Sequence, residues 1–171
     1  MELYFLRHGK AVECGTPGYV NDDRPLTKDG IAEMAVAAVG IRKIAGSFDL
    51  ILSSPLDRAH HTARIVSDTF KKEGQPENKP QVCDELKPGS SAKNLFLYLR
   101  QHKNKDKVLI VGHEPDLSGV ASFLLGAKPS SVELKKGGLC RIDVVDNFAK
   151  GEGLLIFSLP PKILSLLGKS K

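Results

Sequence analysis

The chain has 171 residues, of which 41% are hydrophobic and 26% charged, values typical of a globular protein and not of a disordered one. No apolar run approaches the roughly 20 residues of a membrane-spanning helix, and no basic lead-in to an export segment opens the chain, so we expect a cytoplasmic protein with no membrane association. The net charge of +5 suits an anionic partner, but the lack of Trp and the 6% aromatic content argue against nucleic acid.

The first 125 residues alternate between apolar segments typical of strands and segments with helical periodicity. The first strand ends at Arg7-His8-Gly9, where glycine permits a sharp turn, and Thr27 is a candidate N-cap for the first helix. The expected elements are a strand at residues 2–6, a helix at about 28–45, a strand at 48–52, a helix at about 55–72, a strand near 81–83, a helix at about 91–102, a strand at 108–111 and a helix at about 115–126.

The last third of the chain has a different pattern. Two strands at about 139–145 and 154–159 are expected to form a hairpin, and Pro160-Pro161 then opens a basic C-terminal tail at 161–171. We therefore expect a single domain at 1–160. Strand-helix alternation predicts right-handed crossovers, and hence an α/β three-layer sandwich with a mainly parallel central sheet and helices on both faces.

Four basic side chains are expected to meet at the carboxyl ends of the parallel strands, where ligands bind in such sheets. Arg7 and His8 follow the first strand, Arg58 lies near the start of the helix after the second, and His113 follows the strand at 108–111. Arginine matches phosphate oxygens with a planar fork. A neutral imidazole can attack phosphorus, and a second, protonated histidine would balance the charge of the transition state. This set predicts a site for a dianionic phosphoryl group that requires no metal and no cofactor.

Three motifs in this region resemble those of the histidine phosphatase superfamily, which has the phosphoglycerate mutase-like fold. They are Leu6-Arg7-His8-Gly9, Ser53-Ser54-Pro55-Leu56-Asp57-Arg58-Ala59 with Thr62-Ala63, and Val111-Gly112-His113-Glu114-Pro115. The short chain and the stretch Arg24-Pro25-Leu26-Thr27 are most similar to the SixA branch of phosphohistidine phosphatases. The resemblance covers roughly residues 1–160. It implies that His8 is the phosphorylated nucleophile, that Arg7 and Arg58 clamp the phosphoryl oxygens, and that His113 is the second pocket histidine.

The proton donor is left open. Many members of the family carry an acidic donor in a Leu-x-Glu pattern after the third strand, but this chain has Glu85-Leu86-Lys87-Pro88, with proline in that position. The candidates are Glu85, beside that position, and three residues of the loop after His8: Glu13, Asp22 and Asp23. A phosphoramidate nitrogen is a good leaving group once protonated, so a strong acid is dispensable for such a substrate.

Further polar residues near the motifs have competing interpretations. Ser54 and Glu114 are candidate substrate-binding residues, although we favour a helix-capping role for Ser54. His60 and His61 are helix neighbours whose side chains diverge by about 100°, so both are interpreted as structural. Cys14, Cys83 and Cys140 have no CxxC spacing and predict neither a disulfide framework nor a zinc site.

The sequence therefore predicts a metal-independent phosphatase that acts by double displacement through a phosphohistidine on His8. The preferred substrate is a phosphorylated histidine of a protein, because the chain is too short for the long lid insertions of larger relatives. A phosphatase or mutase for small phosphorylated metabolites is the enzymatic alternative. The non-enzymatic alternative is a phosphate-binding or phospho-accepting regulator. The sequence makes no prediction of oligomeric state.

Overall fold

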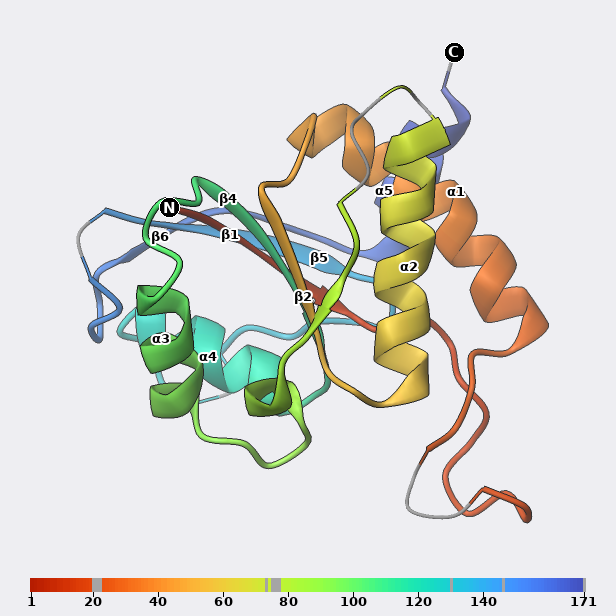
Figure 1. The fold of residues 1–171 in the computed structure, drawn as a ribbon, viewed down its shortest axis with the longest axis horizontal. Helices are drawn as coiled ribbons and strands as arrows, with labels where there is room; N and C mark the ends of the chain where they lie inside the picture. The colour runs from red at the N-terminus through yellow and green to blue at the C-terminus, as the bar shows by residue number, and fades with distance from the viewer. Residues whose placement is uncertain (20–22, 73, 75–77, 130, 146, 171) are drawn as a thin grey trace.

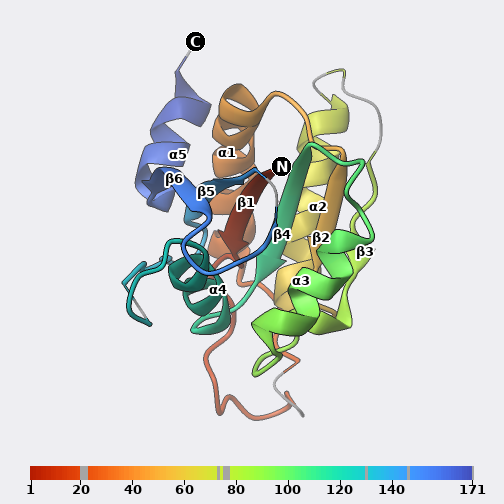
Figure 2. The ribbon, with the colours of Figure 1, turned by 90° about the vertical axis from the view of Figure 1, so that its left-hand side faces the viewer.

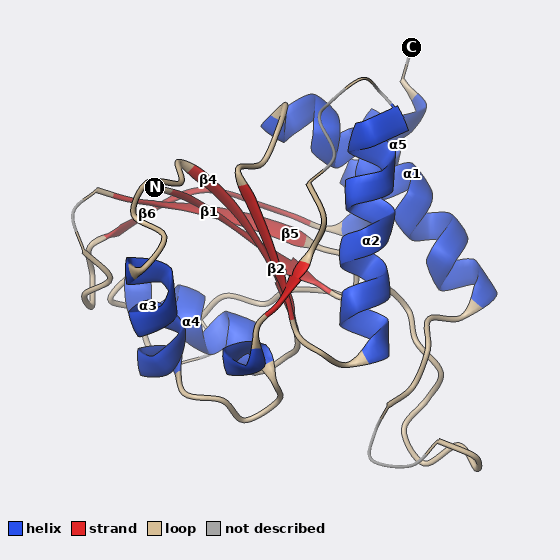
Figure 3. Cartoon of the chain, viewed as in Figure 1, coloured by secondary structure: helices blue, strands red, loops and turns tan. Residues whose placement is uncertain are grey.

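The computed structural model describes residues 1–19, 23–72, 74, 78–129, 131–145 and 147–170. Within them a six-stranded sheet lies between two layers of helices (Figures 1 and 3). The strands follow the order β3-β2-β4-β1-β5-β6; β3, β2, β4 and β1 run parallel, and β5 and β6 are antiparallel to their neighbours. The strands are β1 (Glu2–Arg7), β2 (Leu50–Ser53), β3 (Gln81–Val82), β4 (Lys107–Gly112), β5 (Leu139–Val144) and β6 (Gly153–Leu159).

Helices cover both faces of the sheet, as the sequence predicts. One face carries α1 (Lys28–Ala45), α2 (Asp57–Lys72) and α5 (Pro161–Lys169), and the other carries α3 (Ala92–Arg100) and α4 (Asp116–Leu124), with the short helix η2 (Asp84–Leu86) before α3 (Figure 1). No helix in the described part of the chain is long and apolar enough to cross a membrane.

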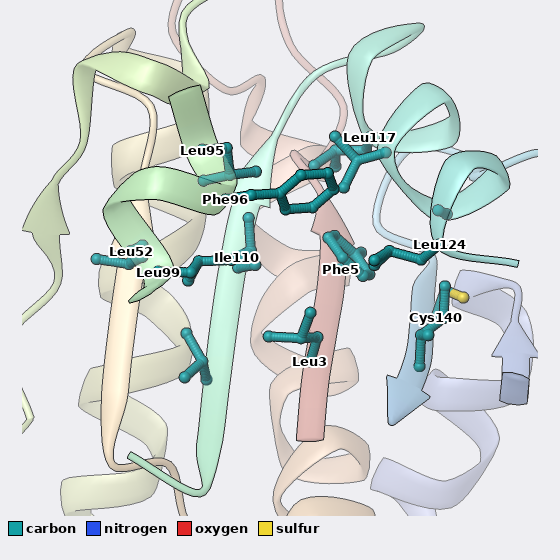
Figure 4. Close-up of a cluster of buried hydrophobic side chains, with 14 of the residues drawn as sticks. Leu3, Phe5, Leu52, Leu95, Phe96, Leu99, Ile110, Leu117, Leu124 and Cys140 are labelled. Atoms are coloured by element: carbon teal, nitrogen blue, oxygen red, sulfur yellow. The ribbon is translucent and has the colours of Figure 1, made fainter. Parts of the chain in front are cut away.

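The two central strands are buried on both sides. Alternate residues of β1 enter opposite cores: Leu3 and Phe5 join the core beneath α3 and α4 (Figure 4), and Tyr4 and Leu6 join the core beneath α1 and α2. Strands buried on both faces have continuous apolar runs, which explains why the sequence predicts them correctly.

The starts of β2 and α2 differ from the predicted ones, and in each case a side-chain hydrogen bond holds the residue at or before the start. The strand expected at 48–52 is β2 at Leu50–Ser53, because the Asp49 carboxylate instead accepts from the N–H groups of Asp106 and Lys107, both at 2.9 Å. Pro55 does not open α2, which begins at Asp57, where the backbone N–H donates to Asp23 Oδ1 at 3.0 Å. The helix at 28–45 is confirmed, with Thr27 Oγ1 accepting from Gly30 N at 3.0 Å.

The tail expected after residue 160 is instead helix α5, which packs on α1. Leu164 is fully buried against α1, and the helices approach so closely that a Cβ on Gly40 would lie 2.1 Å from Leu164 O. Pro161 occupies the first turn of α5, where its missing N–H costs nothing and its fixed φ suits a helix. The double proline therefore starts a helix at this point.

This contact predicts that Gly40→Ala lowers the free energy of unfolding by roughly 1–3 kcal/mol, because the added methyl group meets backbone that cannot yield. The matched control is Gly119→Ala in α4, where a Cβ meets nothing within 4 Å. That change should raise the free energy of unfolding by about 0.5–1 kcal/mol through helix propensity. Urea unfolding followed by circular dichroism measures both; a Gly40→Ala midpoint at or above wild type would mean that α5 does not dock on α1.

Candidate active site

The three sequence motifs meet at the carboxyl ends of β1, β4 and β2. Figure 2 shows β1 and β4 ending at the same edge of the sheet. Backbone hydrogen bonds continue past the strand ends: His8 N donates to Gly112 O at 3.1 Å, and Ser54 N donates to Val111 O at 3.0 Å. Residues from three distant parts of the chain are therefore placed side by side by the parallel register.

A cleft of about 460 Å³ opens at this edge. Its floor is buried, with His8, Arg58 and His113 exposed by 6%, 3% and 3%. Its rim is exposed and includes Lys136. The lining residues are Arg7, His8, Glu13, Cys14, Arg24, Arg58, Pro88, His113, Glu114 and Lys136. All four basic residues singled out from the sequence thus share one cavity.

His8 is held in a single tautomer. Its Nδ1 lies 2.7 Å from Gly9 O, and because a carbonyl oxygen can only accept, Nδ1 carries the proton and Nε2 carries the lone pair. Arg58 Nε donates to that lone pair at 3.3 Å. Burial above all, and the positive charge of His113, Arg58 and Arg7, lower the pKa of His8 to about 3. At neutral pH His8 is an uncharged imidazole with a nucleophilic nitrogen in the cleft.

The lowered pKa of His8 predicts how stability depends on pH. The imidazole titrates near pH 6.5 when unfolded and near 3 when folded, so the unfolded state binds more protons between these values. Lowering the pH from about 6.5 to about 3 should therefore decrease the free energy of unfolding. His8 contributes at most about 1.4 kcal/mol per pH unit to this decrease, and above about pH 6.5 it does not change the free energy of unfolding with pH. Urea unfolding at several pH values should show a shallower decline in His8→Asn; equal slopes would contradict the assignment.

Arg58 is fixed by the first turn of α2. Its backbone carbonyl accepts from Thr62 Oγ1 at 2.7 Å, and the same hydroxyl oxygen accepts from Gly9 N at 3.0 Å. The turn after His8 and the start of α2 are therefore held together by one threonine, which keeps the arginine and the imidazole in contact.

Arg7 approaches the cleft from the end of β1. Its side chain is half-buried, and Nη1 donates to Leu134 O at 2.9 Å. Within the described residues its buried Nε has no hydrogen-bond partner. A buried donor left unpaired in a binding cleft is suited to an anionic ligand.

His113 and Ser54 form a second buried pair. Ser54 Oγ lies 2.8 Å from His113 Nε2, and the rings of His113 and His8 are 5.2 Å apart between centroids. Ser54 Oγ also accepts from Leu56 N at 3.3 Å, so the hydroxyl serves the turn before α2 as well as the histidine. The sequence favoured a helix-capping role for Ser54, but α2 begins at Asp57 and the hydroxyl serves the turn before it; nothing in the sequence indicated the hydrogen bond to His113.

The Ser54 contact predicts a loss of activity on removal of the hydroxyl. Ser54→Ala should lower kcat by roughly 3- to 10-fold, the worth of one hydrogen bond, because the His113 ring loses its orientation. Ser53→Ala is the matched control: it removes the 2.8 Å contact between Ser53 Oγ and His60 Nδ1, and neither partner lines the cleft. Steady-state kinetics of both variants, with a thermal melt for each, tests this. An equal loss of kcat in the two variants would contradict a specific role for Ser54.

The structure separates the proton-donor candidates. Glu13 lines the cleft, whereas Glu85 accepts from Cys83 Sγ at 3.3 Å and faces a smaller neighbouring cavity that it shares with His113. Asp23 accepts from the first N–H of α2 and is not among the described residues that line the cleft. Asp22 lies outside the described residues.

Glu114 is a second carboxyl in the cleft. One oxygen accepts from Ser118 Oγ, and the other is buried with no hydrogen-bond partner in the described part of the chain. Burial raises its pKa, against the opposing effects of Ser118 and Arg7. Glu114 therefore holds a proton more readily than an exposed glutamate does, which sequence reasoning about donors did not detect.

Sequence reasoning also missed part of the rim. Lys136 reaches the cleft because Gly137 N donates to Arg7 O at 3.0 Å, which places the segment before β5 beside the end of β1. Arg24, noticed only as part of a motif, lines the cleft and donates to Val12 O at 2.5 Å. The described residues hold no group of three or more His, Cys, Asp or Glu side chains placed to bind a metal ion.

The fold is an α/β fold with a mainly parallel sheet, and a cationic cleft with a neutral imidazole lies at the carboxyl ends of its strands. These features are typical of proteins that bind phosphoryl groups. Residues 3–86 match the model of the histidine phosphatase superfamily (branch 1). The chain therefore belongs to the histidine phosphatase superfamily, as its three motifs predict, and is a phosphatase of that superfamily acting through a histidine intermediate.

Several known proteins are similar to this chain. An uncharacterized protein of Picosynechococcus sp. (strain ATCC 27264 / PCC 7002 / PR-6) is 36% identical over 143 residues, which cover 81% of this chain and 82% of that protein. The structure of the protein histidine phosphatase SixA complexed with tungstate has a TM-score of 0.80 at 24% identity, covering 96% of this chain and 99% of that one. Phosphoserine phosphatase from Entamoeba histolytica, in complex with 3-phosphoglyceric acid, has a TM-score of 0.68 at 20% identity, covering 92% and 96%. The phosphoglycerate mutase-like fold is confirmed.

Proposed function

We propose that this phosphatase hydrolyses phosphohistidine residues of proteins and that its own phosphorylated intermediate forms on His8. The observation that carries the proposal is the buried contact between Arg58 Nε and His8 Nε2, which supports His8 as a neutral nucleophile and Arg58 as the guanidinium that binds phosphate beside it. The other cleft cations and the pair of His113 and Ser54 surround the same space.

The first transfer follows from this geometry. His8 Nε2 attacks phosphorus, the bond from phosphorus to the substrate imidazole breaks, and the substrate imidazole leaves with the bonding electron pair. Arg58 exchanges its hydrogen bond to Nε2 for one to a phosphoryl oxygen. Arg7, Arg58 and His113 stabilise the charge on the equatorial oxygens in the transition state.

The second transfer regenerates the enzyme. A water molecule attacks phosphorus on His8, the nitrogen–phosphorus bond breaks, and inorganic phosphate leaves. His8 recovers its neutral form with the proton on Nδ1, because Gly9 O continues to accept from that nitrogen. The tautomer set by Gly9 therefore suits both halves of the double displacement.

The leaving group explains the substrate preference. A phosphohistidine whose second ring nitrogen is protonated leaves as a neutral imidazole, so the transfer needs no strong acid beside the leaving nitrogen. The placement of Glu85 against Cys83 and of Asp23 at the start of α2 supports such a substrate. An exposed rim also suits a residue on a protein surface, and the likeness to the protein histidine phosphatase SixA supports the same class.

A small phosphorylated metabolite is the second candidate substrate. An alkyl phosphate ester must protonate its leaving oxygen, and two carboxyls, Glu13 and Glu114, line the cleft. The raised pKa of Glu114 favours its protonated form. The likeness to a phosphoserine phosphatase supports this alternative.

A substrate panel tests the proposal. The kcat/KM values for a histidine-phosphorylated peptide, phosphoserine, 3-phosphoglycerate, a hexose phosphate and a nucleoside monophosphate should be compared side by side. We expect the phosphohistidine peptide to exceed the others by at least about tenfold. A dominant rate on any metabolite would overturn the protein substrate and favour the second candidate. Phosphorylation of His8 without turnover of any substrate would favour a regulator that accepts phosphate.

A further inference from the structure

A second depression lies on the helical face made by α3 and α4. Its apolar part has a volume of about 380 Å³ and adjoins a polar part of about 470 Å³, with which it shares Arg100 and Phe148. Of the described residues that line either part, none lines the cleft of His8. We call the two parts together the α3–α4 groove.

The floor of the α3–α4 groove is aromatic and partly exposed. Phe96 (Figure 4) stacks on Phe148, with ring centroids 5.5 Å apart and planes at 10°, and lies 5.5 Å from Phe123. Phe123 is 37% exposed, and Leu97, one residue along α3, is 47% exposed. Apolar side chains gathered in a depression in this way gain free energy when a partner covers them.

The rim of the groove is cationic. It carries Lys93, Arg100, Lys103 and Lys105, and within the described residues none of these side chains makes a hydrogen bond or an ion pair. Asp106 is the one carboxylate among the described lining residues. Covering the floor with an uncharged partner would remove water from these cations without compensation, whereas carboxylates at the edge of the partner would offset that cost.

We propose that the α3–α4 groove binds an amphipathic helix of a partner protein, with apolar residues against the phenylalanines and acidic residues against the rim. A helix places anchors at i, i+3 or i+4 and i+7 on one face, which suits a groove between two helices. Bases need free aromatic faces for stacking, and the faces of Phe96 and Phe148 that meet are already occupied, so a single-stranded nucleic acid fits less well.

The α3–α4 groove lies close to the active site. Ala92, at the start of α3, lines both the apolar part of the groove and the small cavity that reaches His113. The loop before α3 carries Pro88, which lines the cleft. A bound helix would therefore hold its protein beside the active site, whatever the substrate is.

A designed peptide tests the proposal directly. The probe is a fluorescent, stapled 18-residue helix with leucines at i, i+3 or i+4 and i+7 and glutamates elsewhere, and the control peptide has lysines in place of the glutamates. We expect the wild-type protein to bind the acidic peptide at least about tenfold more tightly than the basic one in fluorescence anisotropy. Equal binding of the two peptides, or no binding of the acidic one, would overturn the proposal.

Variants locate the binding site. Arg100→Glu/Lys103→Glu, and separately Leu97→Asp, should weaken binding of the acidic peptide at least about tenfold. Arg64→Glu/Lys162→Glu, a charge-matched pair on the opposite helical layer, should leave it unchanged. All three should keep wild-type kcat on a small phosphorylated substrate, which shows that they fold. Binding that survives both groove variants, or tighter groove-dependent binding to vesicles containing anionic phospholipid, would contradict a helical protein partner.

Discussion

Replacing His8 with alanine should reduce kcat by roughly 10⁴-fold or more, the scale of loss seen when a covalent nucleophile is removed. The reason is structural: His8 Nε2 carries a lone pair and lies beside Arg58 in the cleft, since Gly9 O fixes the proton on Nδ1. His113 Nε2 lies 2.8 Å from Ser54 Oγ, and we expect it to stabilise the transferred phosphoryl group without replacing His8 as the nucleophile. Rapid-mixing kinetics with a chromogenic phosphate ester would measure the residual rate.

The control for this variant is His60→Ala. His60 lies in α2 on the same side of the sheet, contacts Ser53 Oγ through Nδ1 and is not among the residues that line the cleft. Its loss should cost about 1 kcal/mol of stability and change kcat by less than about threefold. Turnover retained in His8→Ala would remove the mechanism, whatever the behaviour of His60→Ala.

Substitution of Arg58 should have the second largest effect. Arg58→Ala should lower kcat/KM by roughly 10²- to 10³-fold, because the transition state loses a preorganised donor. Arg58→Lys should recover little of this, since an ammonium cannot reach two phosphoryl oxygens with a planar fork. The side chain is 3% exposed, so either change also removes a contact to His8 Nε2.

Arg64→Ala is the matched control for Arg58, because Arg64 is an exposed arginine of the same helix. It should leave kcat/KM within about threefold of wild type. Thermal melts of all three variants separate loss of fold from loss of chemistry. A kcat/KM near wild type in Arg58→Lys would show that charge alone is sufficient and would refute the bidentate contact.

The sheet could be predicted from sequence because its strongest signals are local. The runs in β1 and β4 are continuous and apolar, and α1 is capped by Thr27 Oγ1. Helix α5 could not be found in this way: Pro160-Pro161 is typical of a chain that leaves a domain, and the contact that holds α5, Leu164 against Gly40, joins residues far apart in sequence.

In the site, too, local features could be predicted from the sequence and tertiary contacts could not. Arg7, His8, Arg58 and His113 could be predicted because each follows a recognisable strand end or helix start. The position of Lys136 beside the cleft depends on the hydrogen bond from Gly137 N to Arg7 O, and the orientation of Glu85 depends on its contact with Cys83. These are tertiary contacts that no local pattern encodes, so the sequence could not choose among the proton-donor candidates.

Trapping the intermediate tests the account most directly. Wild-type protein mixed with a phosphohistidine peptide, quenched rapidly at neutral to alkaline pH and digested, should show by mass spectrometry one phosphoryl group on the peptide that contains His8. The group should disappear after acid treatment, as a phosphoramidate does, and should be absent from His8→Ala. A phosphoryl group on any other residue, or steady turnover with no labelled peptide under conditions that preserve phosphohistidine, would contradict the account.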